Sequence, residues 1–252
     1  MGKLGLQLYT IRDETTRDFL GSIKKVAQIG YQGVEFAGFF DTPADVVKKT
    51  LDEAGLETAG AVVNWRDLEG DLAASIAYCQ TIACPTIICP WVDEGKRQSL
   101  ADFKAVVDSF HHFGAQCKDN GIRFLHHIHG FEFIPIAGTC LMDYLLEHLD
   151  PALVNFEIDV YWVEHAGVDS VAFMEKIGSR CPSIHFKDTS SKTRFHDTEV
   201  GAGVIDMPSI MRLGKQFGAQ WFIVEQEEFE RPSLESAAIS FANLKNLALS
   251  VE

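Results

Sequence analysis

Short apolar runs rich in β-branched and aromatic residues alternate along the chain with longer stretches in which apolar residues recur at helical spacing. Side chains alternate in a strand but repeat about every 3.6 residues in a helix, so the two periods predict repeated strand–helix units. Strands are predicted near residues 4–9, 33–36, 57–63, 86–89, 122–128, 154–158, 183–187 and 221–226. Helices are predicted near residues 16–30, 43–54, 72–82, 100–120, 139–148, 170–180, 207–217 and 233–251.

Glycines mark the ends of several predicted helices. Gly30, Gly55, Gly121 and Gly218 each stand between a helical stretch and the next strand, where a left-handed residue commonly ends a helix. No Ser/Gly linker or shift in composition divides the chain, so residues 1–252 are predicted to form one domain. Eight parallel strands in one α/β domain of this size most simply close into a (β/α)8 TIM barrel, whose chemistry sits on the loops after the strands.

Residues of metal-binding type stand where four of the predicted strands end. His127 and His129 alternate at one strand end, and Asp159, His185 and Glu225 stand at three others. Because the strand ends of a barrel face one mouth, these side chains can converge on one point. Oxygen and nitrogen ligands of this kind predict a divalent-metal site that is open to a substrate.

Composition narrows the classes of partner. The formal net charge is −14 and no basic stripe is present, which argues against nucleic acid because its binders cluster Lys and Arg. Six scattered cysteines without a CxxC pair are typical of reduced, packed thiols in a cytoplasmic protein. No apolar run reaches membrane-spanning length, and the first residues lack the apolar region of a signal peptide. We expect a soluble cytoplasmic protein without a membrane partner, which acts on a small molecule and could form a homo-oligomer.

Seven short motifs give the chain a specific family resemblance. In order, they are LGLQLYTIR, GYQGVEFAG, GIRFLHHIHGFEF, IDVYWVEHAG, IHFKD, EVGAGVID and IVEQE. They resemble the xylose-isomerase-like TIM-barrel superfamily of sugar isomerases and epimerases, over essentially the whole chain. The resemblance implies metal ligands at His127, Asp159, His185 and Glu225. The fifth-strand ligand is usually a glutamate in the isomerase and epimerase branch, so His127 departs from that pattern, as in a less characterised branch with a Tyr-His-Asn-His strand.

A histidine at this position changes the expected chemistry. Two carboxylates, two neutral imidazoles and a divalent cation sum to about zero charge, where three carboxylates would leave about −1. We therefore expect a metal that polarises a bound oxygen more strongly, and Mn, Co, Ni or Zn rather than Mg, because imidazole is a borderline ligand. The change also removes a glutamate that the family uses as an acid/base group. Glu132, in the loop after His127, is the predicted replacement, with Glu225 acting on the opposite side.

These residues predict a metal-dependent sugar isomerase or epimerase. Such an enzyme abstracts a proton next to a carbonyl, and its metal stabilises the enediolate that forms. Lys187 lies on the same strand as His185 and is expected to donate to an oxyanion or hydroxyl in the mouth. Three aromatic residues near strand ends, Trp65, Trp91 and Phe131, either suit stacking on a sugar ring or are ordinary packing. The predicted substrate-binding residues are His129 and Trp162, together with Gln7, Tyr9 and Glu35, which either face the mouth or make a satisfied bond in the core.

Other functions stay open. The same site suits elimination by a lyase or dehydratase on a keto-sugar, a 3-keto-glycoside or a keto-inositol. Elimination needs only one base and a strong Lewis acid, so the histidine at position 127 favours this alternative. A nuclease of the endonuclease IV type shares the barrel but needs more zinc ligands and a basic DNA-binding face. A non-enzymatic binding protein would not need so many ionisable groups at one mouth. Few basic residues are expected near the mouth, which favours an unphosphorylated sugar.

Overall fold

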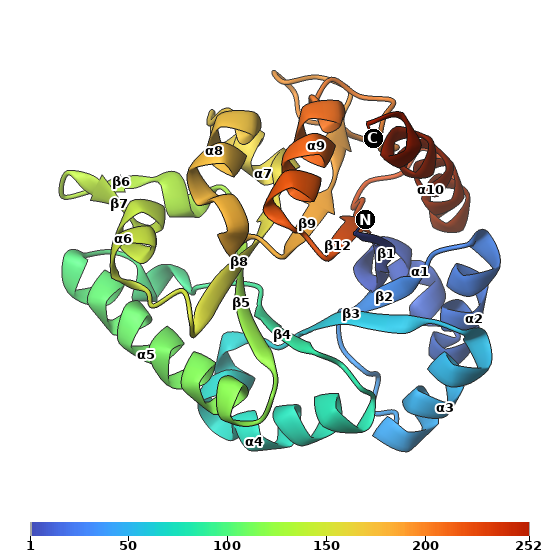
Figure 1. The fold of residues 1–252 in the computed structure, drawn as a ribbon, viewed down its shortest axis with the longest axis horizontal. Helices are drawn as coiled ribbons and strands as arrows, with labels where there is room; N and C mark the ends of the chain where they lie inside the picture. The colour runs from blue at the N-terminus through green and yellow to red at the C-terminus, as the bar shows by residue number, and fades with distance from the viewer. Residues whose placement is uncertain (1, 252) are drawn as a thin grey trace.

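The computed structural model describes residues 2–251, and its centre is a closed barrel of eight parallel strands (Figure 1). Around the barrel the order is β1, β2, β3, β4, β5, β8, β9 and β12, which pairs again with β1. The strands are β1 Lys3–Gln7, β2 Gly33–Phe36, β3 Glu57–Val62, β4 Thr86–Cys89, β5 Arg123–Ile128, β8 Val154–Asp159, β9 Ser183–Phe186 and β12 Trp221–Val224. The predicted (β/α)8 TIM barrel is confirmed.

Helices surround this barrel on its outside (Figure 1). The longer ones are α2 Phe19–Ile29, α3 Ala44–Ala54, α4 Trp65–Thr81, α5 Leu100–Asp119, α6 Leu141–His148, α8 Ser170–Ile177, α9 Met207–Phe217 and α10 Ser233–Ser250. The short ones are α1 Arg12–Thr15, α7 Val160–His165 and the 3-10 turns η1 Leu8–Ile11, η2 Glu94–Lys96, η3 Phe131–Phe133 and η4 Gly178–Arg180. Two small antiparallel hairpins follow β5 and β9, namely β6 Pro135–Ile136 with β7 Thr139–Cys140, and β10 Asp188–Thr189 with β11 Asp197–Thr198.

Local capping explains where the predicted bounds were wrong. Strand β1 ends at Gln7, because its side-chain oxygen accepts a hydrogen bond from the Tyr9 amide at 3.0 Å and begins a 3-10 turn. Helix α4 begins at Trp65 after the cap Asn64, and the non-helical backbone of Asp71 interrupts the pattern that predicted a later start. Residues 139–140 form a strand of a hairpin, and Cys140 caps α6.

The predicted glycine ends are confirmed. Gly30, Gly55 and Gly218 are left-handed C-caps with φ of 115°, 69° and 80°, and Gly121 follows α5 with φ of 72°. A residue with a Cβ is strained in this region, so glycine ends each helix and lets the chain turn toward the next strand.

A small apolar plug fills the amino-terminal half of the barrel interior. Trp221 packs there with Ala59 and Ile223, as a cluster separate from the main core between strands and helices. Gly33 makes room for this ring, since a Cβ there would lie 2.4 Å from Cη2 of Trp221. The apolar plug therefore leaves the carboxyl-terminal half of the interior to polar side chains.

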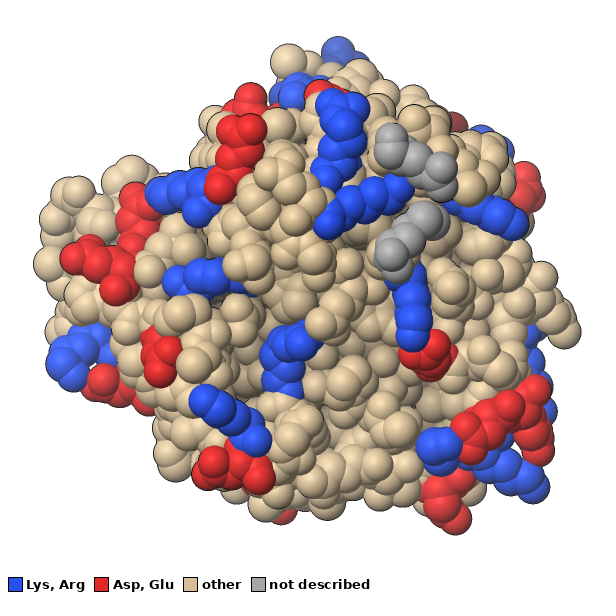
Figure 2. Space-filling view, viewed as in Figure 1, with Lys and Arg blue, Asp and Glu red and all other residues tan. Residues whose placement is uncertain are grey.

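The charged side chains on one face and the state of the cysteines can be compared with what the composition predicted. On the face shown in Figure 2, where the chain ends lie, Lys and Arg side chains are interspersed with Asp and Glu. All six cysteines are free thiols, and all but Cys140 are buried. Within the described residues, no helix is both long and apolar enough to cross a membrane.

Candidate active site

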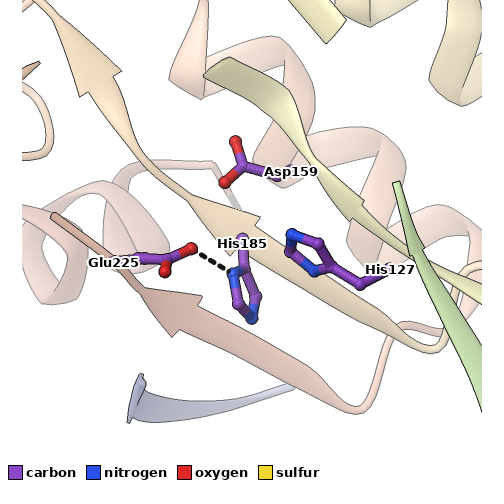
Figure 3. Close-up of side chains that lie close together, drawn as sticks. All are labelled: His127, Asp159, His185 and Glu225. Atoms are coloured by element: carbon purple, nitrogen blue, oxygen red, sulfur yellow. Dashed lines mark hydrogen bonds and ion pairs between the residues drawn. The ribbon is translucent and has the colours of Figure 1, made fainter. Parts of the chain in front are cut away.

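Four side chains point toward one another at the carboxyl ends of neighbouring strands (Figure 3). His127 comes from β5, Asp159 from the end of β8, His185 from β9 and Glu225 from the residue after β12. Each offers one ligand atom, and these atoms all lie within 4.8 Å of one another. All four side chains are buried. The structure therefore brings together the four residues that the sequence predicted as metal ligands.

Two further carboxylates lie behind the imidazoles. Nδ1 of His127 donates to Glu157 at 2.9 Å. Nε2 of His185 donates to Glu35 at 2.8 Å and lies 3.2 Å from Glu157. Both glutamates are fully buried. An imidazole that donates one N–H to a carboxylate is held in one orientation, and His127 keeps its other nitrogen available to a ligand.

His185 carries the charge of this arrangement. Its Nδ1 donates to Glu225 at 2.7 Å, so both ring nitrogens face carboxylates. Burial lowers the pKa of His185, but Glu157, Glu35 and Glu225 outweigh burial and hold the pKa well above its ordinary value. Burial raises the pKa of Glu225, but His185 and Lys187 outweigh it and keep that pKa low. The same burial, with Glu157 nearby, raises the pKa of Glu35 to about 8.

The group fits a divalent cation. Oδ2 of Asp159 is buried and has no hydrogen-bond partner, while Oδ1 accepts from the amides of Tyr161 and Trp162 at 2.9 and 3.1 Å. Burial raises the pKa of Asp159 well above its ordinary value. A buried carboxylate without a partner is costly unless it is paired or ligated. Two imidazoles and two carboxylates are a donor set suited to borderline divalent metals.

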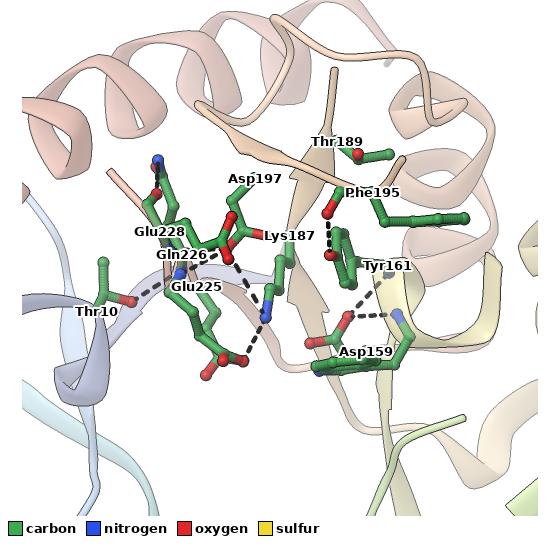
Figure 4. A network of polar contacts seen from close by, with 12 residues as sticks. Thr10, Asp159, Tyr161, Lys187, Thr189, Phe195, Asp197, Glu225, Gln226 and Glu228 are labelled. Carbon is green, nitrogen blue, oxygen red and sulfur yellow. Dashed lines mark hydrogen bonds and ion pairs between the residues drawn. The ribbon is translucent and has the colours of Figure 1, made fainter. Parts of the chain in front are cut away.

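Lys187 lies beside this group and is almost fully buried (Figure 4). Its Nζ makes an ion pair with Glu227, lies 3.9 Å from Asp197, and sits 4.7 and 4.8 Å from the ring centres of Tyr161 and Trp162. Burial lowers the pKa of Lys187, but the surrounding carboxylates outweigh burial and hold the pKa above its ordinary value. Glu225 and Asp159 contribute most to this increase. The ammonium is therefore a cationic hydrogen-bond donor and not a base.

Glu132 does not join the four ligand-type residues. Its carboxylate is fully buried on the outer side of β5, where Oε1 accepts from Nε2 of His126 at 2.9 Å and Oε2 accepts from the His129 amide at 3.0 Å. His126 also packs on Phe110 of α5, at 5.1 Å between ring centres. Both oxygens of Glu132 are thus engaged in fixing the loop after β5. The acid/base role predicted for Glu132 has no support from these contacts.

Gln7 and Glu35 contact each other and lie behind His185. Nε2 of Gln7 donates to Oε1 of Glu35 at 2.6 Å, and both side chains are buried. Of the two alternatives for these residues, the satisfied bond in the interior is the one observed. Tyr9 is instead 45% exposed on the turn after β1, at the mouth.

A cavity of about 770 Å³ lies beside the four residues and reaches them at Glu225. Glu225 forms part of its wall, together with the predicted substrate-binding residues Tyr9, His129 and Trp162. Further lining residues are Trp91, Gly130, Phe131, Phe133, Ile134, Pro135, His165, Ala166 and Glu227. Burial and the neighbouring His127 lower the pKa of His129, which is therefore a neutral imidazole. It lies at the edge of the ligand group, as we call His127, Asp159, His185 and Glu225 together.

The glycine-rich stretch GAGVID folds on a carboxylate of the protein itself. Amides of Gly201 and Gly203 donate to Oδ2 of Asp188 at 3.0 and 3.1 Å, and the Ile205 amide donates to Oδ1 at 3.3 Å. Backbone amides that already bind a carboxylate are not available to a phosphate.

Sequence reasoning missed Glu157 and Asp197. Glu157 stands two residues before Asp159 on β8, so strand alternation places both on the inner face, and that signal was present in NFEID. Asp197 belongs to a two-residue strand of the β10–β11 hairpin, which is too short to show a period. Its Oδ2 accepts from the Glu227 amide at 2.7 Å and so joins the hairpin to the loop after β12.

A parallel barrel with imidazoles and carboxylates gathered at the carboxyl ends of its strands is an architecture of barrel enzymes. The profile of the xylose isomerase-like TIM barrel family matches residues 23–247, and the chain belongs to this family. The resemblance drawn from the seven motifs is confirmed, and with it the prediction that the protein is an enzyme.

Individual relatives are distant. The chain is 24% identical to inosose dehydratase of Geobacillus kaustophilus (strain HTA426) over 255 residues, covering 86% of this chain and 82% of that protein. A sugar phosphate isomerase/epimerase from Parabacteroides distasonis ATCC 8503 has a TM-score of 0.84 and 24% identity, with 98% of this chain and 94% of that chain covered. The IolI protein, solved with a bound zinc atom, has a TM-score of 0.79 and 13% identity, with 99% of each chain covered. The solved structures share the fold of this chain.

Proposed function

We propose that the protein is a metal-dependent lyase that eliminates water or an alcohol from a keto-inositol or keto-sugar. The observation that carries this proposal is the placement of the carboxylates at the cavity. Among the lining residues that the structure describes, Glu225 and Glu227 are the carboxylates, and both follow β12. Epimerisation needs proton-transfer groups on both faces of the substrate carbon, whereas elimination needs one base and an acid for the leaving group.

The ligand group supplies the polarising centre. A divalent metal held by His127, Asp159, His185 and Glu225 would act as a Lewis acid on the substrate carbonyl and so acidify the neighbouring C–H. Glu157 and Glu35 hold the two imidazoles in place through the hydrogen bonds described above. The borderline donor set favours Mn, Co, Ni or Zn over Mg.

Glu225, His129 and Lys187 have different roles in the proton transfers and hydrogen bonds of the reaction. The carboxylate of Glu225 stays ionised and accepts the proton from the carbon next to the carbonyl. That C–H electron pair becomes the new C=C bond, while the oxygen on the next carbon departs with the C–O pair and takes up a proton. The proton that Glu225 has accepted would pass to this departing oxygen, and the neutral imidazole of His129 would hydrogen-bond to it. The Lys187 ammonium donates to an oxygen of the substrate from beside Glu225 and Asp159.

The comparisons support elimination more than the isomerisation or epimerisation that the sequence predicted as the main function. The curated relative described above is named for the dehydration of an inosose, which is a keto-inositol. The glutamate expected to replace the lost family base, Glu132, is bonded to His126 instead of facing the cavity.

Proton NMR in heavy water tests the proposal. Protein loaded with Mn, Co or Zn would be given 2-keto-myo-inositol, and quenched, metal-stripped samples would be analysed. We expect loss of water and an unsaturated or diketone product, and no such product with Asp159→Ala, whose ligand group is incomplete. Formation of an epimer with the hydroxyl groups all retained would contradict the lyase assignment.

A further inference from the structure

The cavity beside the ligand group is larger than one sugar ring requires. Its volume of about 770 Å³ lies in the upper part of the roughly 300–1,000 Å³ range of ligand sites in proteins. A free keto-inositol or monosaccharide is a single six-membered ring, and its carbonyl must reach the ligand group at the floor. Most of the cavity would then remain filled with water.

The walls of the outer part are aromatic. Trp91 and Phe131 lie 4.6 Å apart between ring centres, and Phe131 is stacked on His129 at 5.8 Å with an angle of 15° between the rings. The guanidinium of Arg97 lies 4.1 Å from the ring centre of Phe131 and stabilises its position. Trp91 is 43% exposed and Tyr9 is 45% exposed, which is unusual for such large rings. Exposed aromatic faces of this kind stack on planar groups or on the C–H faces of sugars.

This wall is continuous with the ligand group. His127 and His129 lie 4.6 Å apart between ring centres, and His129 lies 5.7 Å from Trp162. At the junction, Nδ1 of His129 and Nε1 of Trp162 are buried polar atoms without a partner. An indole N–H only donates, so it requires an acceptor such as an ether or hydroxyl oxygen. A ring bound at the ligand group and joined through oxygen to a second ring would supply that acceptor.

Charge limits what the second ring can be. Among the described residues that line the cavity, none is Lys or Arg, whereas Glu225 and Glu227 are acidic. Arg97 is held against Phe131, with its Nε donating to the Val92 carbonyl at 3.1 Å. A phosphate or another anion would lack a partner here, and both carboxylates are already paired with His185 and Lys187, so the outer group is uncharged.

We propose that the substrate is a keto-glycoside, a keto-sugar joined through its glycosidic oxygen to a second uncharged ring that stacks on Trp91 and Phe131. This inference rests on the proposed lyase function and specifies its leaving group. The proton leaves the carbon between the carbonyl and the glycosidic carbon, its electron pair forms the C=C bond, and the glycosidic C–O bond breaks. The second ring departs as an alcohol after its oxygen takes up a proton, so no oxidant or reductant is consumed.

Binding measurements test the outer ring independently of the reaction. Calorimetry on the Zn-loaded protein would compare phenyl β-D-glucopyranoside and cellobiose with methyl β-D-glucopyranoside. We expect phenyl glucoside, cellobiose or both to bind at least tenfold more tightly than methyl glucoside, and the tighter ligand identifies an aromatic or a sugar ring. Trp91→Ala should remove most of this preference. Phe40→Ala is the matched control, because Phe40 is 48% exposed and does not line the cavity. Equal or undetectable binding of all three ligands, or a preference that Trp91→Ala leaves intact, would overturn the inference.

Turnover separates this inference from the proposed function. The 3-keto derivative of phenyl glucoside would be compared with 2-keto-myo-inositol. We expect kcat/KM to be at least 100-fold higher for the glycoside, and Trp91→Ala to act mainly through KM. Equal or faster turnover of the free keto-inositol would sink the inference and leave the lyase function standing. Turnover of neither compound would count against the lyase function, and the binding preference would then decide the inference alone.

Discussion

The negative charge that His127 removes from strand β5 is present one strand away, on Glu157. With His127 in place of a glutamate, the sequence predicted a more strongly polarising metal. The structure places Glu157 2.9 Å from Nδ1 of that same histidine and 3.2 Å from Nε2 of His185. A carboxylate bonded to a ligating imidazole increases the basicity of that ligand. The expected gain in Lewis acidity is therefore smaller than the simple charge sum indicated.

Glu157→Gln tests this coupling of two imidazoles. The amide keeps the size of the side chain but removes its charge and one acceptor, so both imidazoles lose part of their support. We expect the affinity for Zn or Co to fall by about 10–100-fold, measured by competition with a chromophoric chelator. Glu175→Gln, on the exposed surface of α8, is the matched control. Unchanged affinity together with an unchanged visible spectrum of the Co-loaded protein would show that Glu157 does not position the ligands.

Glu132→Gln distinguishes a structural carboxylate from a catalytic one. In the observed structure the substitution weakens the bond to His126 in a fully buried site, and a disrupted buried hydrogen bond costs about 1–3 kcal/mol. We expect a lower free energy of unfolding in urea, with solvent-proton exchange into substrate reduced less than tenfold. A loss of exchange of about 100-fold or more at unchanged stability would restore the proton-transfer role that the sequence predicted.

At the scale of elements, the sequence predicted those parts of the fold whose signal is local and repeated. Buried strands such as Gly33–Phe36 and Thr86–Cys89 were located to the residue, because apolar runs between turn residues mark their ends. The two hairpins were missed because two-residue strands have no period. For the site, strand alternation predicted which residues at strand ends face the barrel interior. The side chain of Glu132 instead points according to the conformation of a 3-10 turn, which a single sequence does not specify.

The loop that carries Asp197 offers a test at this scale. Asp188 holds the loop through three amides, and a Cβ on Gly203 would lie 2.2 Å from Oδ1 of Asp188 and 2.4 Å from the Thr189 carbonyl oxygen. We expect Gly203→Ala to lower stability by about 1–3 kcal/mol, as overpacking does. Gly70→Ala is the control, because Gly70 lies within α4 with open space around its Cβ position, and alanine there should raise stability by up to about 1 kcal/mol. Thermal unfolding followed by circular dichroism measures the stability of both variants. Equal changes in melting temperature would show that the loop rearranges to accommodate the added methyl group.

At the scale of the whole molecule, the barrel holds a cluster of acids in its carboxyl-terminal half. The apolar plug around Trp221 closes the other half, so Glu35, Glu157, Asp159 and Glu225 are all buried in the same interior. Lys187 and His185 balance part of this charge. A cation bound by these residues would stabilise the folded state by RT ln(1 + [L]/Kd).

Asp159→Asn should consequently change stability in opposite directions with and without metal. The amide oxygen can keep the two hydrogen bonds from Tyr161 and Trp162, while the buried carboxyl, whose ionised form burial disfavours, is removed. In a chelator we expect the variant to unfold at the same temperature as the wild type or higher. With Zn at about 100 times the wild-type Kd, the wild type should gain about 2.7 kcal/mol, and the variant much less because it has lost a ligand. Scanning calorimetry in both conditions decides. If the variant is destabilised equally in both, the carboxylate serves packing, and the four side chains are not a metal site.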